Sequence, residues 1–175
     1  LEAQIRQAAA DQRATLGRDL PVHIKLIEEA GPPSIDTLLT YPGVKARFVD
    51  YLATQGLTLE QAQADTAKWH YHTHDFRCLL FAQTAAETTK LVEQYFPAGT
   101  TANSGSFYPT TGEYPSLIRG DDCFTLFKER GVTEFCSEMS WGLGSTPDYL
   151  GPQTQSYEAA LARALTKYHR SPMGT

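Results

Sequence analysis

Three histidines alternate along the segment WHYHTHDF, which spans Trp69 to Phe76 and also contains Asp75. Imidazole nitrogens and carboxylate oxygens are ligands for zinc and related metals, so the segment could hold an ion if its side chains converge. His70, His72 and His74 would share one face of a strand, but they would not share one face of a helix. The chemistry of this motif therefore depends on the element that carries it.

The surrounding sequence favours a helix over about Leu59 to Phe96. Apolar residues recur there at three- and four-residue steps among Ala, Glu, Gln and Lys, namely Phe76, Leu79, Leu80, Leu91 and Tyr95. On a helix only His70 and His74 have the i, i+4 spacing of a zinc pair, and the segment lacks the Glu of an HExxH motif. We therefore predict helical residues from His72 onward and no metal site. A strand would instead favour a metal-dependent hydrolase that uses the three histidines.

Carboxylates at the ends of predicted strands give a second kind of candidate chemistry. Glu28 and Glu29 come directly before the turn at 30–33, and Glu138 precedes Trp141 by three residues. In parallel α/β folds, functional sites gather where the strands end, because the loops there vary without disturbing the core. Paired carboxylates in such a place can act as general acid and base.

Composition excludes several classes of function. The chain has 175 residues, 41% of them hydrophobic, and a formal net charge of −5. This charge gives no reason to expect a nucleic acid or an anionic membrane as partner, and no apolar run approaches the roughly 20 residues of a membrane span. Cys78, Cys123 and Cys136 are widely spaced and form no CxxC pair, so neither a disulfide framework nor a zinc–cysteine site is expected.

Helices and short apolar strands alternate along the chain. The patterns predict helices at about 1–16, in two pieces around Pro42, at about 59–96, near 121–131 and at about 156–168. Three strands, near Val22–Glu28, Thr100–Asn103 and Thr133–Glu138, are expected to lie side by side and parallel. This order is typical of an α/β fold with a parallel sheet.

Five segments together resemble a known family: LIEEAGPPS, VKARFVDYLATQGLT, HDFRCLLFAQTAAETTKLVEQYFP, TTANSGSFYP and GVTEFCSEMSWG. They are similar to the middle of the (β/α)8 TIM barrel in glycoside hydrolases of the β-galactosidase type, especially family 42. The resemblance implies an incomplete barrel, about strands 4 to 6 with their helices. It implies one domain over residues 1–175, with a helical insertion at about 34–66.

The resemblance also implies a function, which is carbohydrate hydrolysis by carboxylate acid–base catalysis without a cofactor. Glu29 and Glu138 would be the catalytic acids, and the nucleophile is expected beyond Thr175. The residues expected to bind the substrate are Glu28, Asn103, Phe107, Tyr108 and Trp141, of which the aromatic ones offer ring faces for sugar C–H groups. The alternative is a non-catalytic module that binds carbohydrate or has a structural role.

Overall fold

A computed structural model of the chain describes residues 1–18, 21–28, 33–97, 99–104, 122–134, 156, 159–160 and 163–167. The named elements follow in chain order: α1 (Glu2–Leu16), β1 (His23–Glu28), α2 (Ile35–Leu38), α3 (Pro42–Thr54), α4 (Leu59–Gln63), α5 (Thr66–Tyr95), β2 (Thr100–Ser104) and α7 (Cys123–Lys128). The described residues of the segment 156–167 are also helical.

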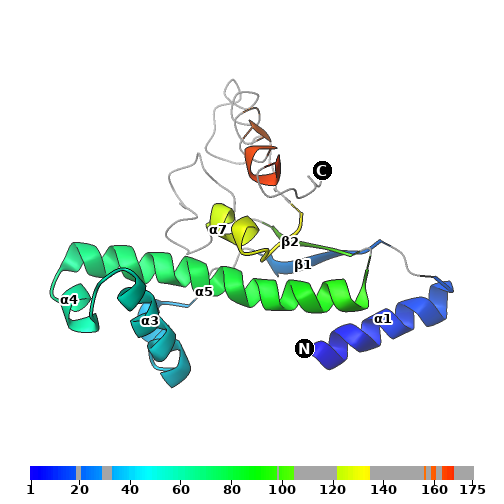
Figure 1. Ribbon diagram of the computed structural model, residues 1–175. Helices are drawn as coiled ribbons and strands as arrows, with labels where there is room; N and C mark the ends of the chain where they lie inside the picture. The colour runs from blue at the N-terminus through cyan, green and yellow to red at the C-terminus, as the bar shows by residue number, and fades with distance from the viewer. Residues whose placement is uncertain are drawn as a thin grey trace, which may run out of the picture.

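Helix α5 is the longest element, and the other elements pack along it (Figure 1). Its 30 residues span about 45 Å at 1.5 Å per residue. The Asp65 carboxylate starts the helix by accepting hydrogen bonds from the backbone N–H groups of Ala67 and Lys68. The Thr73 and Thr84 hydroxyls donate to carbonyls four residues earlier, which satisfies these polar groups within the helix.

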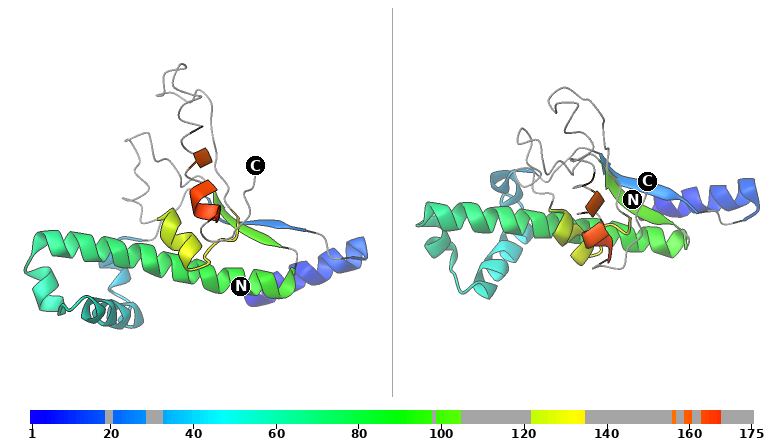
Figure 2. Two further views of the ribbon diagram at one scale, coloured as in Figure 1. Left: turned by 45° about the horizontal axis from the view of Figure 1, so that its top comes forward. Right: turned by 90° about the horizontal axis from the view of Figure 1, so that it is seen from above.

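Two parts of α5 bury different faces. Its N-terminal half packs against α2, α3 and α4, and Phe48 and Leu52 of α3 are fully buried there with Phe76 of α5. Its C-terminal half packs against α7, α1 and β1 in two further apolar clusters. One cluster includes Ala82, Leu126 and Phe127, and the other includes Ala9, Val92 and Phe96. Both views of Figure 2 agree with this order along the helix. The buried face of α5 is therefore different in its N-terminal and C-terminal halves.

Strands β1 and β2 form a parallel pair on one side of α5. His23 pairs with Thr100 at the first residues of the strands, and Glu28 pairs with Ser104 at the last. The register shifts between Lys25 and Ile27, where β1 carries one extra residue. Such a bulge bends a strand and interrupts the alternation of its side chains.

The predicted TIM-barrel fold is wrong. The described residues are mostly helical and contain only the two strands β1 and β2, so they do not form an arc of a barrel. In a barrel each helix packs across the sheet, whereas α2, α3 and α4 pack on the far end of α5. The physical reason is that local periodicity gives the type of each element but does not decide which elements pack together.

Individual elements were predicted more accurately than their assembly. The helix from His72 onward, the helix near the N-terminus, the first two strands and their parallel pairing are confirmed. The third strand is not confirmed, because Thr133 and Glu134 are not in a strand and residues 135–138 lie outside the described part of the chain. The backbone N–H groups of Thr133 and Glu134 nevertheless donate to the Thr101 carbonyl of β2, at 3.0 Å each.

Candidate functional site

The parallel pairing brings two of the predicted site residues to the same end of the sheet. Glu28 is the last residue of β1 and pairs with Ser104, and Asn103 of β2 pairs with Ile27. Five other predicted site residues lie outside the described residues, namely Glu29, Phe107, Tyr108, Glu138 and Trp141. The backbone register sets Glu28 and Asn103 near the carboxyl ends of adjacent strands.

The three histidines of α5 point in different directions. His72 Nδ1 lies 3.2 Å from the Tyr51 hydroxyl, on the side of α3. His74 Nε2 lies 3.6 Å from the Cys78 sulfur, one turn further along α5, and His70 is exposed. In the part of the chain that the structure describes, no three His, Cys, Asp or Glu side chains are close enough to hold an ion together. A hydrolase that uses all three histidines on one metal is therefore not supported.

A hydrogen-bonded group joins α3 to α5 beside these histidines. The Tyr51 hydroxyl donates to the Asp75 carboxylate at 2.6 Å. Burial, followed by the hydrogen bond and charge of Asp75, raises the pKa of Tyr51 above its ordinary value of 10.0. Because the hydroxyl proton is used by Asp75, the contact with His72 requires that the imidazole Nδ1–H donates to the tyrosine oxygen. This arrangement fixes a neutral tyrosine between two helices.

The pair formed by His74 and Cys78 is not a nucleophilic dyad. Burial raises the pKa of the Cys78 thiol to about 11. Burial, and then the Arg77 charge, lowers the pKa of His74. Both shifts favour the neutral pair over a thiolate and an imidazolium, whereas nucleophilic cysteines need a lowered pKa. Cys78 is only 4% exposed, which also limits attack on a substrate.

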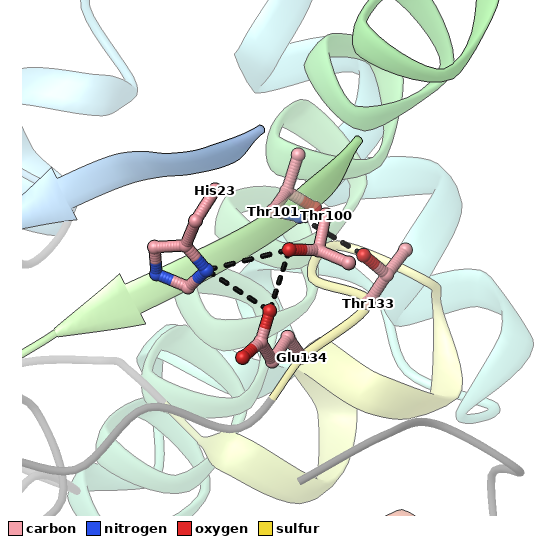
Figure 3. A network of polar contacts seen from close by, with 5 residues as sticks. All are labelled: His23, Thr100, Thr101, Thr133 and Glu134. Carbon is pink, nitrogen blue, oxygen red and sulfur yellow. Dashed lines mark hydrogen bonds and ion pairs between the residues drawn. The ribbon is translucent and has the colours of Figure 1, made fainter. Parts of the chain in front are cut away.

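A polar network crosses the amino ends of the two strands (Figure 3). His23 Nδ1 lies 2.9 Å from Glu134 Oε2, and the Thr100 hydroxyl donates to the same oxygen at 2.5 Å. Since an ionised carboxylate only accepts hydrogen bonds, the His23 Nδ1 carries the proton, and Nε2 is left on the other side of the ring. The side chain of Glu134 is 17% exposed and that of His23 is 43% exposed.

The segment that carries Glu134 is fixed to β2 and α5 by further bonds. Thr101 donates its backbone N–H to the Thr133 hydroxyl at 3.0 Å, and the buried Thr89 hydroxyl donates to the Gly131 carbonyl at 2.8 Å. A Cβ added to Gly131 would lie 2.9 Å from the Ala82 carbonyl oxygen, so this close approach requires glycine. The network thus belongs to a docked segment, residues 131–134, which follows α7.

The network at the amino ends of the strands has the features of a structural contact. An oriented imidazole resembles half of a catalytic triad, but the side-chain contacts of His23 to described residues use Nδ1, and none joins Nε2 to a hydroxyl or thiol that could serve as nucleophile. Sites of parallel sheets also gather at the carboxyl ends of strands, and this network lies at the amino ends. We therefore interpret it as an anchor for residues 131–134.

Neither the anchor nor the hydrogen-bonded group around Tyr51 was predicted from the sequence. His23, Thr100 and Glu134 are 34 to 111 residues apart in the chain, so no local spacing connects them. One usable signal was present, because His23 and Thr100 lie at the beginnings of two predicted strands and parallel pairing brings the beginnings of strands together.

Comparisons with protein-family models, with curated proteins and with solved structures find no match for this chain. Among the described helices, none has the length and apolar character that crossing a membrane requires.

Proposed function

We propose that the protein hydrolyses a carbohydrate substrate by carboxylate acid–base catalysis, at the end of the sheet where β1 and β2 finish. The observation that carries the proposal is the parallel register, in which Glu28 ends β1 beside Asn103 and Ser104 of β2. An acid and an amide on adjacent strand ends are suited to bind sugar hydroxyls and to transfer protons. The sequence segments that we interpret as similar to glycoside hydrolases of the β-galactosidase type suggest the same substrate class, although the barrel that this similarity implied is not the observed fold.

The bulge in β1 adds a second supporting feature. It lies between Lys25 and Ile27, immediately before the acids Glu28 and Glu29. Bulges are over-represented beside active sites, where they redirect a side chain. In this proposal Glu29 is the proton donor, and Glu138 acts mainly in substrate binding. The neighbouring Glu28 carboxylate would raise the pKa of Glu29 by charge repulsion, which keeps a proton on the donor near neutral pH.

The test compares glutamine variants on aryl glycosides with good and poor leaving groups. Glu29→Gln removes the proton donor while keeping its shape, so kcat/KM should fall by about 10²–10⁴ for a poor leaving group and less for a good one. Glu138→Gln should raise KM more than it lowers kcat. Glu87→Gln, at an exposed position of α5, is the control and should leave both constants unchanged.

Two outcomes would reject the proposal. Wild-type turnover in Glu29→Gln would exclude this residue as the proton donor. Absence of turnover on every glycoside, combined with oligosaccharide binding measured by calorimetry, would instead identify a carbohydrate-binding module, the alternative that the sequence left open.

A further inference from the structure

We propose that His23 is a phosphoryl-acceptor site, whose Nε2 takes a phosphoryl group from a phosphoramidate, independent of the proposed hydrolase function. The anchor uses only one nitrogen of this ring, because Nδ1 lies 2.9 Å from Glu134 Oε2 and 3.3 Å from the Thr100 hydroxyl oxygen. With the proton on Nδ1, the lone pair lies on Nε2, which is therefore the nucleophilic nitrogen. Figure 3 shows Nε2 on the side of the ring that points away from Glu134 and Thr100.

The imidazole lies on the outer face of β1. Val22 and Ile24 pack against the apolar cluster that includes Val92 of α5. Since side chains alternate along a strand, His23 and Lys25 leave the opposite face, before the bulge, and both are exposed. The side chain of His23 is 43% exposed, so a small donor can reach it. Lys25 adds a positive charge on the face that the phosphoryl oxygens would approach.

The Glu134 carboxylate is held in a fixed position beside the ring. Its side chain is 17% exposed, and its Oε2 accepts a hydrogen bond from the Thr100 hydroxyl at 2.5 Å. The Glu134 backbone N–H donates to the Thr101 carbonyl at 3.0 Å. As a bond forms at Nε2, the imidazole of His23 gains positive charge, and a carboxylate that is already in place stabilises this charge without rearrangement.

The transfer conserves atoms and electrons. The Nε2 lone pair of His23 forms a bond to the phosphorus of the phosphoramidate, and the phosphorus–nitrogen bond of the donor breaks. The electron pair of that bond leaves with the protonated nitrogen, as ammonia. The Nδ1 proton stays between the ring and Glu134, so the product is the Nε2 isomer of phosphohistidine, and no oxidant or reductant takes part.

His70 provides an internal standard for the test. It is exposed on α5, and its imidazole has no hydrogen-bond, ion-pair or ring partner among the described residues. In one sample with phosphoramidate, His23 should be phosphorylated at least about tenfold faster than His70, because only His23 has a carboxylate in contact. Peptide mass spectrometry at alkaline pH measures both rates, and ³¹P NMR identifies the isomer. In urea the two rates should become equal within about twofold, since the contact with Glu134 is lost.

Two glutamine variants test the role of the carboxylate. Glu134→Gln removes the charge and keeps the shape, so the ratio of the His23 rate to the His70 rate should fall at least about fivefold in protein that circular dichroism shows to be folded. Glu87→Gln, at an exposed position of α5, is the matched control and should leave the ratio unchanged.

Three results would overturn the proposal. They are a wild-type His23 that reacts no faster than His70, a product at His23 that is mainly the Nδ1 isomer, and a folded Glu134→Gln variant that keeps the wild-type ratio. The first two are measured on the wild type, so they decide the question even if the variant does not fold. Loss of the proposed glycosidase activity would not affect any of these readouts.

Discussion

The hydrogen bond between Tyr51 and Asp75 gives the most direct test of how α3 is held to α5. Tyr51→Phe removes the hydroxyl that donates to Asp75 at 2.6 Å and keeps the ring. The ring contacts with Phe48 and Phe76, at centroid distances of 6.2 and 5.6 Å, should therefore survive. Any loss of stability then reports the polar group and not the packing.

The expected loss follows from the environment of the two partners. Hydrogen bonds to charged groups contribute about 1.5–3 kcal/mol, but Asp75 is exposed and water can replace the tyrosine. We therefore expect Tyr51→Phe to lower the free energy of unfolding by about 1–2 kcal/mol. Tyr41→Phe, at a residue that is 59% exposed, is the control and should change it by less than about 0.5 kcal/mol.

A double-mutant cycle with Asp75→Ala isolates the interaction. Urea denaturation of the wild type, both single variants and the double variant should give a coupling energy of about 1 kcal/mol. Replacing Asp by Ala raises helix propensity by itself, and Asp50→Ala, at an exposed position of α3, measures that gain so that it can be subtracted. A coupling energy within about 0.3 kcal/mol of zero would refute the reasoning, because the bond would then add nothing to stability.

The same bond predicts a pH dependence. The folded state raises the pKa of Tyr51 above 10.0, so it keeps the phenol proton that the unfolded state loses. The stabilisation is fully present below pH 10 and decreases as the pH rises above it. Wild-type stability should therefore fall more steeply above pH 10 than that of Tyr51→Phe. Equal slopes would show that Tyr51 titrates as it does in the unfolded chain.

Three further predictions follow from the described contacts. Glu134→Gln should lower the free energy of unfolding by about 1–2 kcal/mol in urea denaturation, since two hydrogen bonds to a charged oxygen are weakened, whereas Glu87→Gln should not. Gly131→Ala should lower the free energy of unfolding by about 1–3 kcal/mol, and with it the thermal midpoint, because the added Cβ would lie 2.9 Å from a carbonyl oxygen. Gly43→Ala should not, because a Cβ added there meets no atom within 4 Å. Burial raises the pKa of Cys78 from 9.0 to about 11, so its alkylation at pH 8 should be at least about a hundredfold slower in the native protein than in the denatured protein. Peptide mass spectrometry measures both rates, and equal rates would contradict the burial of the thiol.

The sequence predicted local elements well because their signals are local. Asp122 precedes the apolar turn of α7 and caps it through the Phe124 N–H, and the three- and four-residue steps from Phe76 to Tyr95 do form one helix. The predicted helix from about Leu59 was one element too long, since Asp65 caps α5 and separates it from α4. Such a cap within a helical pattern is visible in the sequence.

The assembly could not be predicted from the same signals. Alternation of strands and helices suggested a barrel, but Phe48 and Leu52 of α3 are buried against α5 and not against a sheet. The apolar residues of an amphipathic helix show that it has a buried face, and they do not identify the partner that covers it. Parallel pairing of β1 and β2 was predictable because a long helix separates them, which excludes a tight hairpin.

The two ends of the sheet can now be separated experimentally, which matters for the proposed function. His23 and Glu134 meet at the beginnings of the strands, whereas Glu28 is the last residue of β1, five positions further along, and Asn103 is the last but one of β2. At about 3.3 Å per residue this is roughly 16 Å along the strand, too far for one group of side chains to span both ends. A substitution in the anchor should therefore act on stability, and one among the acids on turnover. If Glu134→Gln reduced kcat in protein that remains fully folded, this separation would be wrong and the anchor would belong to the catalytic machinery.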